Sequence, residues 1–261
     1  MPQTANRTKK HRILIRYSLF VIRYSLFVIR YSLFVIKNTE GVSEQSQTIN
    51  QTAKIILEDV GKRFRYEWIF RNLSMTFESG KTYALLGSNG SGKSTLMKIL
   101  SGHLSPSAGK ISFYLSEKKQ DEDNIYKHIS YAAPYIELIE ELTLTEMIQF
   151  HTKFKPLNNN LKTNDLVEIL AFEKSRNKEI RYFSSGMKQR LKLALAICSE
   201  SPILLLDEPT TNLDTQGVAW YRQLISRFTE GSHRLTIVAS NIEHDYDFCD
   251  KMLNIEDFKK V

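Results

Sequence analysis

A nine-residue segment rich in glycine and serine separates an apolar run at residues 83–86 from another at residues 96–100. It consists of Gly87, Ser88, Asn89, Gly90, Ser91, Gly92, Lys93, Ser94 and Thr95. This order fits the pattern G-x-x-x-x-G-K-[ST], in which backbone N–H groups and a helix N-terminus bind phosphate oxygens. The flanking runs predict a buried strand and a helix, as that pattern requires. We therefore expect a nucleotide site, with Lys93 on the β- and γ-phosphates and the Ser94 hydroxyl on Mg²⁺.

A second apolar run, residues 203–206, ends in two carboxylates, Asp207 and Glu208. A buried strand that ends in acids places charge at the carboxyl edge of a parallel sheet, where ligands bind. Asp207 would then hold Mg²⁺ through water, and Glu208 would orient and deprotonate an attacking water. A solvated acidic turn is the alternative, and the nearby phosphate loop argues against it.

Short apolar runs alternate with helical patterns from residue 54 onward. We expect strands at residues 54–60, 73–77, 82–86, 110–115, 128–132, 203–207, 235–240 and 252–255. We expect helices at residues 94–101, 143–154, 163–171, 186–199, 215–229 and 243–249. This alternation predicts an α/β fold with a mostly parallel sheet covered on both faces. Residues 135–190 lack strand patterns and are expected to form a helical insert between two halves of the sheet.

The formal net charge of +7 is concentrated near the start of the chain. Residues 1–50 contain eight Lys or Arg and two Glu, which leaves about +1 for residues 51–261. That part has no global basic bias and no basic aromatic platform, so we expect no nucleic-acid partner. The two cysteines, Cys198 and Cys249, lie outside any metal-ligand spacing and predict a reduced, cytoplasmic chain.

Residues 16–36 are three identical copies of Arg-Tyr-Ser-Leu-Phe-Val-Ile. Packing tolerates similar apolar residues, so perfect identity favours a tandem repeat in the DNA, translated from an upstream start site. A membrane-associated tail is the alternative, but Arg16, Arg23 and Arg30 limit each uncharged stretch to six residues, whereas a span needs about twenty. We expect residues 1–53 to be this repeat plus a linker, disordered or a start-site artefact, before a domain at residues 54–257.

Further segments resemble motifs of the ATP-binding cassette (ABC) ATPases. Residues 183–190, Phe-Ser-Ser-Gly-Met-Lys-Gln-Arg, are similar to that family's signature Leu-Ser-Gly-Gly-Gln and precede the acidic strand, as in the family. Residues 212–214, Asn-Leu-Asp, match its dimer-contact loop. The resemblance covers residues 54–257. It implies a P-loop NTPase core with a mostly parallel sheet, an antiparallel β subdomain and an inserted α-helical subdomain.

The resemblance also assigns residues to ATP. Ser184 and Gly186 of the signature would meet the γ-phosphate of an ATP held by a second subunit, while a simple N-cap role for Ser184 stays open. Phe64 occupies the family's position for an aromatic that stacks on adenine. Tyr66 and Trp68 are rivals for that role, and any of the three could instead be ordinary strand packing.

Two positions depart from the family pattern. Pro134 stands where the family has a Gln that senses Mg²⁺ and contacts the membrane subunit, and proline offers neither a side-chain oxygen nor an N–H. Asn241 stands where the family has a His on the γ-phosphate, with His244 three residues later. An amide donates a neutral hydrogen bond but carries no charge. Losing a charge-assisted contact weakens transition-state stabilisation by about 1–3 kcal/mol, so we expect intact ATP binding with slow hydrolysis.

The resemblance implies a cytoplasmic ATPase subunit, peripheral on the inner face of the cell membrane, that binds ATP and Mg²⁺. It implies a homodimer or paired cassette bound to a separate transmembrane permease, with closure over two ATP molecules driving transport. The single cassette and its signature are most similar to small exporter-type subunits, including those of haem export and cytochrome c maturation. Slow turnover leaves open an ATP-gated regulatory or mechanical coupling subunit of a membrane complex.

Overall fold

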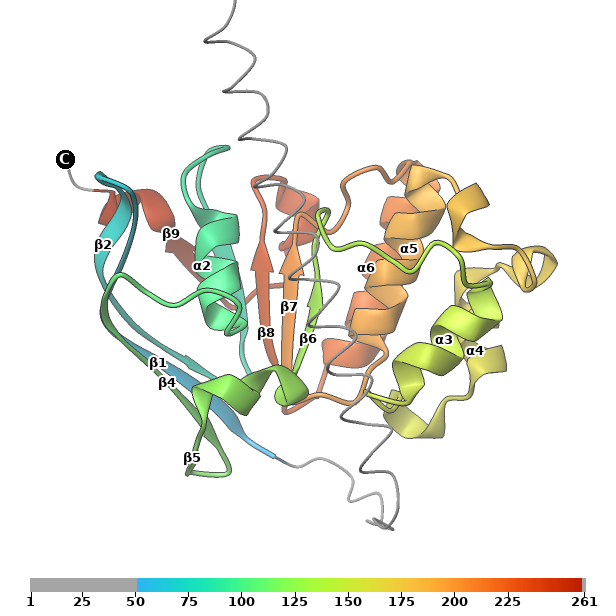
Figure 1. Cartoon of the computed structure of the whole chain (residues 1–261), viewed down its shortest axis with the longest axis horizontal. Helices are drawn as coiled ribbons and strands as arrows, with labels where there is room; N and C mark the ends of the chain where they lie inside the picture. The colour runs from blue at the N-terminus through green and yellow to red at the C-terminus, as the bar shows by residue number, and fades with distance from the viewer. Residues whose placement is uncertain (1–50, 260–261) are drawn as a thin grey trace, which may run out of the picture. The chain divides into compact units, whose positions relative to one another are not determined.

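Residues 51–259 are described by the computed structural model of the chain (Figure 1). The repeat at residues 16–36 and the expected extension as far as residue 50 lie outside the described residues, as do residues 260–261. The elements below all belong to one unit of the chain, residues 49–261.

Five parallel strands form one sheet, in the order β6-β7-β8-β3-β9. Their bounds are β3 (Thr82–Leu86), β6 (Ile129–Ala132), β7 (Ile203–Asp207), β8 (Leu235–Ala239) and β9 (Lys251–Asn254). Every residue of β7 and β8 is buried, as is typical of parallel strands covered on both faces. Because the strands are parallel, their carboxyl ends meet at one edge, from which the phosphate loop and the acidic end of β7 both project.

A second sheet is antiparallel, in the order β2-β1-β4-β5. Its strands are β1 (Ala53–Phe64), β2 (Glu67–Glu78), β4 (Ala108–Leu115) and β5 (Lys118–Gln120). Inward side chains of β1, among them Ile55, Leu57 and Val60, are buried in a core that this sheet shares with α2 (Lys93–Leu100) and one face of the parallel sheet. The antiparallel sheet thereby fixes α2, and with it the phosphate loop, against β3.

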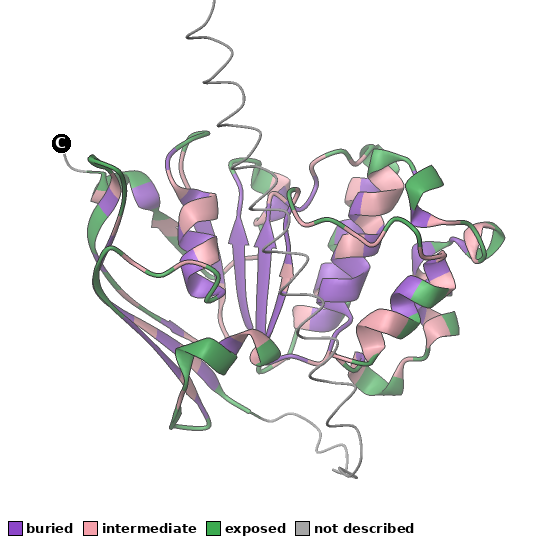
Figure 2. Ribbon diagram, in the orientation of Figure 1, coloured by how far each residue is buried: buried purple, intermediate pink, exposed green. Residues whose placement is uncertain are grey.

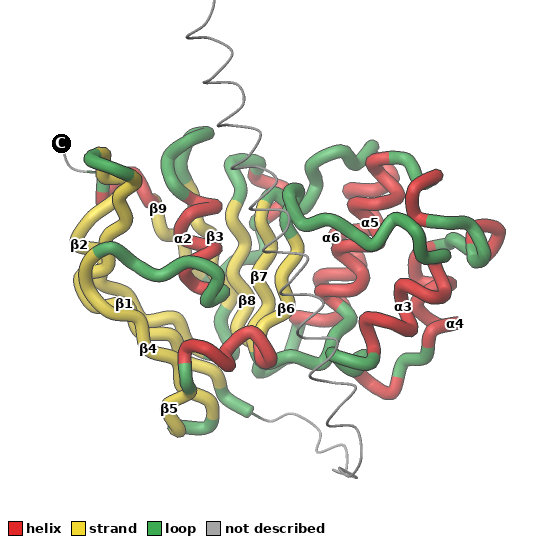
Figure 3. Tube along the Cα trace, in the orientation of Figure 1, coloured by secondary structure: helices red, strands yellow, loops and turns green. Residues whose placement is uncertain are grey.

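The remaining helices lie on the side of the parallel sheet opposite α2: α5 and α6 lie beside the sheet, and α3 and α4 lie farther out (Figure 1, Figure 3). They are α3 (Leu144–Thr152), α4 (Thr163–Leu170), α5 (Ser185–Ile197) and α6 (Thr215–Thr229). Successive residues of β7 alternate between the two cores: Ile203 and Leu205 pack with α2, whereas Leu204 and Leu206 pack with these helices. Figure 2 shows the strands of the sheet buried between the two layers.

Most predicted elements are present, and the differences are local. The predicted strand at residues 73–77 is part of the longer β2, and the sequence did not predict β5. The predicted helix at residues 243–249 is wrong, because this segment holds only a 3-10 turn, Glu243–Asp245. Ser240 explains the difference: its hydroxyl donates to Asp245 Oδ2 at 2.6 Å and accepts from the Ile242 N–H at 3.1 Å. Within residues 51–259, no helix is both long enough and apolar enough to cross a membrane.

Candidate active site

The phosphate loop is a backbone cradle that requires glycine at three positions. Gly87, Gly90 and Gly92 have φ values of 143°, 79° and 112°, in the region that disfavours other residues. A Cβ on Gly92 would lie 2.5 Å from the Ile69 side chain of β2, so close packing also requires glycine there. Gly92 is the N-cap of α2 and provides no side-chain cap. The first amides of α2 are therefore available to an anion.

Lys93 begins α2 and turns its ammonium group back over the loop. Its side chain is 4% exposed, and Nζ donates to the carbonyl oxygens of Gly87 at 2.7 Å and Ser88 at 3.2 Å. Nζ also lies 4.0 Å from Oε1 of Glu208, which follows β7. The structure therefore brings together the phosphate loop and the second acid around one positive charge, an arrangement suited to nucleotide phosphates.

Asp207, at the end of β7, has the properties of a magnesium ligand. It is fully buried, and its Oδ1 has no hydrogen-bond partner among the described residues. Burial raises the pKa of Asp207, while hydrogen bonds from Ser94 and Tyr135 oppose that rise. A carboxylate oxygen without a partner beside a serine hydroxyl suits Mg²⁺, which prefers oxygen ligands. The residues present therefore fit the ion.

Glu208 directly follows Asp207 but has different surroundings. Its φ of 47° is left-handed, and its backbone N–H donates to the carbonyl oxygen of Ala239 at 2.8 Å. The Glu208 side chain is 30% exposed, so its carboxylate can reach water. An acid held in a rare backbone conformation beside a lysine is typical of a reactive site, and its access to water suits a general base.

Both positions that depart from the family pattern lie in described segments. Asn241 does lie against the phosphate loop, because its Nδ2 donates to Oδ1 of Asn89 at 3.4 Å. His244 contacts a different residue: its Nε2 lies 3.3 Å from the hydroxyl of Thr210. Pro134 offers a carbonyl oxygen, which accepts a hydrogen bond of 3.0 Å from a lysine of α5. Among residues 51–259, no hydrogen bond joins a histidine or glutamine side chain to the phosphate loop.

The three candidate aromatics lie in the β1–β2 hairpin. Cations lie over two of these rings: the guanidinium groups of Arg63 and Arg71 lie 5.6 Å and 4.6 Å from the Trp68 centroid, and Lys62 Nζ lies 5.4 Å from the Phe64 centroid. Phe64 is 49% exposed and Tyr66 is 94% exposed. Stacking on adenine therefore stays a prediction for Phe64, with Tyr66 and Trp68 as its rivals.

The signature residues lie at the start of α5. Ser184 is the N-cap of this helix and accepts a hydrogen bond from the Met187 N–H at 3.2 Å, so it does have the N-cap role. A Cβ on Gly186 would lie 3.0 Å from the carbonyl oxygen of Asn212, in the loop after β7. Within residues 51–259, no hydrogen bond or ion pair joins Ser184 or Gly186 to the phosphate loop. Their contact with ATP stays a prediction that requires a second copy.

The sequence analysis assigned no function to three side chains near the site, which are Tyr131, Tyr135 and Glu256. Tyr135 donates to Oδ2 of Asp207 at 3.2 Å and is hydrogen-bonded to Tyr131. Glu256, in the 3-10 helix η6 (Ile255–Phe258), accepts hydrogen bonds from the hydroxyl and the backbone N–H of Ser88. These bonds hold the pKa of Glu256 below its usual range. The contact partners lie 72 and 168 residues apart in the chain, so no local pattern could reveal them.

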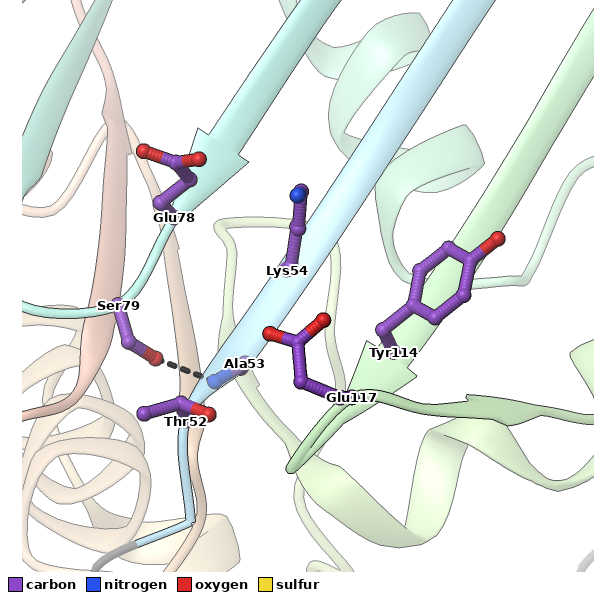
Figure 4. Close-up of a pocket in the computed structure, with 7 residues that line it drawn as sticks. All are labelled: Thr52, Ala53, Lys54, Glu78, Ser79, Tyr114 and Glu117. Atoms are coloured by element: carbon purple, nitrogen blue, oxygen red, sulfur yellow. Dashed lines mark hydrogen bonds between the residues drawn. The ribbon is translucent and has the colours of Figure 1, made fainter.

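Figure 4 shows a separate pocket beside the start of β1. The backbone N–H of Ala53 donates to the hydroxyl of Ser79 there. The residues that line it are Thr52, Ala53, Lys54, Glu78, Ser79, Tyr114 and Glu117. None of the residues predicted to bind nucleotide is among them, so this pocket is not the candidate site.

Comparison with known proteins agrees with this geometry. The family model described as "ABC transporter" matches residues 70–211, which include the phosphate loop, the signature and both acids. The chain belongs to the ABC transporter family. YybJ, an uncharacterised ABC transporter ATP-binding protein of Bacillus subtilis, is 32% identical over 200 residues, 74% of this chain and 88% of the relative. The lantibiotic transport ATP-binding protein SrtF of Streptococcus pyogenes is 31% identical over 201 residues, 74% of this chain and 83% of that one.

This ABC ATPase also has solved structural neighbours. One is the ATP-binding cassette MJ0796 in a dimeric post-hydrolysis state bound to ADP and Pi. It has a TM-score of 0.66 and 22% identity, and the match covers 77% of this chain and 93% of that one. The predicted α/β fold, with its parallel core, antiparallel sheet and inserted helices, is confirmed. So is the predicted class, an ATP-binding and ATP-hydrolysing cassette of the ABC transporter family.

Proposed function

We propose that this ABC ATPase powers a membrane transporter, as a homodimer or paired cassette bound to a separate transmembrane permease. The observation that carries the proposal is the 4.0 Å approach of Lys93 Nζ to Glu208 Oε1, which joins the phosphate-binding and water-activating parts of one site. The similarity to SrtF, a lantibiotic transport ATP-binding protein, and to the dimeric MJ0796 supports it. The subunit would work in the cytoplasm, at the inner face of the cell membrane, where ATP is available.

Each copy would bind one ATP along the carboxyl edge of its parallel sheet. The amides of Gly87 to Thr95, together with the Lys93 ammonium group, would hold the β- and γ-phosphates. Ser94 and Asp207 would hold Mg²⁺, which neutralises phosphate charge and orients the phosphates when bound. Glu208 would orient the attacking water and accept its proton.

The remaining contacts would hold the adenine base and complete the ATP-binding pocket. Phe64 would stack on adenine from the β1–β2 hairpin. Asn241, already against Asn89, would donate a neutral hydrogen bond near the γ-phosphate. Ser184 and Gly186 would reach the ATP of the second copy, because Gly186 lies against the loop after β7 and, within residues 51–259, neither is hydrogen-bonded to its own phosphate loop. Nucleotide would therefore draw two copies together, and hydrolysis would separate them.

The test is ATP-dependent dimerisation of the Glu208→Gln variant, measured by light scattering after size-exclusion chromatography. With Mg-ATP we expect a stable pair of copies, since the amide cannot accept a proton from water while the phosphate contacts persist. The matched control, Glu208→Gln combined with Lys93→Ala, should stay single. A Glu208→Gln protein that binds Mg-ATP yet stays single at concentrations far above its Kd would contradict the proposal.

A slow-turnover coupling role is the second candidate, and the neutral Asn241 at the phosphate loop favours it. The ATP-trapped Glu208→Gln protein can be used to capture its membrane partner. A polytopic permease as the main partner would support transport. A single-span envelope or division protein would support coupling.

A further inference from the structure

Tyr135 contacts the magnesium-ligand candidate from a loop that follows the edge strand of the sheet. Its hydroxyl donates to Oδ2 of Asp207 at 3.2 Å. The other carboxylate oxygen of Asp207, Oδ1, is buried and has no hydrogen-bond partner among residues 51–259. One oxygen of the carboxylate is therefore held by a phenol, and the other remains free for a ligand.

Neighbouring side chains fix the Tyr135 ring in place. The Lys98 ammonium group of α2 lies 4.2 Å from the ring centroid, a cation–π distance. The ring of Tyr131, from β6, lies 6.3 Å away at an interplanar angle of 75°, an edge-to-face contact. The hydroxyls of Tyr131 and Tyr135 are also hydrogen-bonded to each other. Two elements that flank Asp207, the helix α2 and the strand β6, thus jointly orient one hydroxyl.

The phenol is suited to this task because its O–H is a hydrogen-bond donor. A phenol O–H that donates to a carboxylate makes a charge-assisted hydrogen bond, which fixes the orientation of that carboxylate. Without this bond the Asp207 carboxylate could rotate, and rotation would weaken a metal contact.

We propose that Tyr135 is a positioning residue for the metal, which clamps Oδ2 of Asp207 so that Oδ1 faces Mg²⁺. The inference rests on the proposed function, since it concerns the metal of that same site. It also gives a role to the segment in which Pro134 replaces the glutamine expected from the family resemblance. The residue next to that proline supplies the polar contact that proline lacks. Outer-shell partners of this kind typically change metal affinity by about 10- to 100-fold.

The test is direct metal binding by the Tyr135→Phe protein, which keeps the ring and loses only the hydroxyl. Mn²⁺ replaces Mg²⁺ as an electron paramagnetic resonance probe, titrated into protein saturated with a non-hydrolysable ATP analogue. We expect Tyr135→Phe to weaken Mn²⁺ binding about 10-fold or more, as removal of an outer-shell partner should. Tyr131→Phe, which removes only the supporting hydroxyl, should give a smaller loss in the same direction. Affinity for the analogue in the presence of EDTA should be unchanged in both.

Tyr114→Phe is the matched control, because Tyr114 lies in the pocket of Figure 4, outside the candidate site. It should bind Mn²⁺ like the wild type. In steady-state assays, Tyr135→Phe should raise the Mg²⁺ concentration needed for half-maximal ATPase activity more than it lowers kcat at saturating Mg²⁺, a split that a packing defect would not produce. Equal Mn²⁺ affinity of Tyr135→Phe and wild type overturns the inference alone. A wild-type protein that binds no Mn²⁺ with the analogue overturns the inference and the proposed function together.

Discussion

Asp207 and Glu208 are adjacent carboxylates with opposite surroundings, and the backbone between them creates the difference. Asp207 ends a buried strand and is fully enclosed, whereas Glu208 adopts a φ of 47° and leaves its side chain 30% exposed. A left-handed conformation at a non-glycine residue costs about 1–3 kcal/mol. Its presence here, fixed by the hydrogen bond to Ala239, allows one acid to face a metal and the next to face water.

A single residue, Asn241, also determines the expected rate of ATP hydrolysis. Asn241→His restores a side chain that can carry charge beside the phosphate loop, so we expect turnover to rise about tenfold to a hundredfold. The measurement is steady-state phosphate release by purified protein with saturating Mg-ATP. Ile242→His, which adds an imidazole one residue later at a 40% exposed position, should leave the rate near that of the wild type. No gain in Asn241→His would show that the neutral amide does not limit the reaction.

At the scale of elements, the sequence predicted those whose chemistry is local. The phosphate loop, β7 with its two acids and the N-cap of α5 each depend on residues within a short segment. The contacts of Tyr135 and Glu256 depend on pairs far apart in the chain, which only the assembled sheet brings together. The helix predicted at residues 243–249 fails for a different reason, because the hydroxyl of Ser240 competes for the backbone of the turn.

Helix α5 provides an element-scale test of the signature. Ser184→Ala removes the N-cap hydrogen bond to Met187 and should lower the free energy of unfolding by about 1 kcal/mol. Ser184→Asp keeps a good cap but adds a negative charge where the second copy's γ-phosphate would lie. We expect Ser184→Asp to be as stable as the wild type yet unable to form the ATP-dependent pair in the Glu208→Gln background.

Thermal unfolding and light scattering measure these two effects separately. Thr143→Asp provides the control, because Thr143 also accepts an N-cap hydrogen bond, from the Glu146 N–H at 3.3 Å, and α3 holds none of the residues predicted to bind nucleotide. In the Glu208→Gln background, the Thr143→Asp protein should form the ATP-dependent pair and bind ATP as the protein without this change does. Normal pairing of Ser184→Asp would mean that the start of α5 does not approach the partner's nucleotide.

At the scale of the whole molecule, two cores lie on opposite faces of one sheet, and the helical layer also encloses a titratable side chain. His151 lies in the last turn of α3, with Nε2 2.7 Å from the hydroxyl of Ser199. Burial, and then the charge of Lys155, lower the pKa of His151 to about 4. The folded protein therefore keeps this imidazole neutral at pH values where the unfolded chain would protonate it.

The pH dependence of stability follows from this shift. Below the unfolded value of 6.5 the unfolded chain binds a proton that the folded chain rejects, so stability falls as pH drops from 6.5 toward 4. The contribution lost over this window is about 3 kcal/mol. Urea unfolding at several pH values should show a shallower decline for His151→Gln than for the wild type. Replacement of the exposed His233 by Gln should leave the decline unchanged, and an equal decline in all three proteins would contradict the assignment.

The order of strands in the parallel sheet has a consequence for synthesis. The strand that carries the phosphate loop, β3, acquires its two neighbours, β8 and β9, from residues 235–254. During synthesis on the ribosome, β3 and the phosphate loop would therefore be made some 150 residues before β8, the first of the two neighbouring strands, leaves the exit tunnel. Such long-range strand pairing is slow, and it leaves both edges of the apolar strand β3 unpaired until β8 and β9 are made. Stalled, half-made copies should accordingly depend on chaperones and gain no protection from ATP.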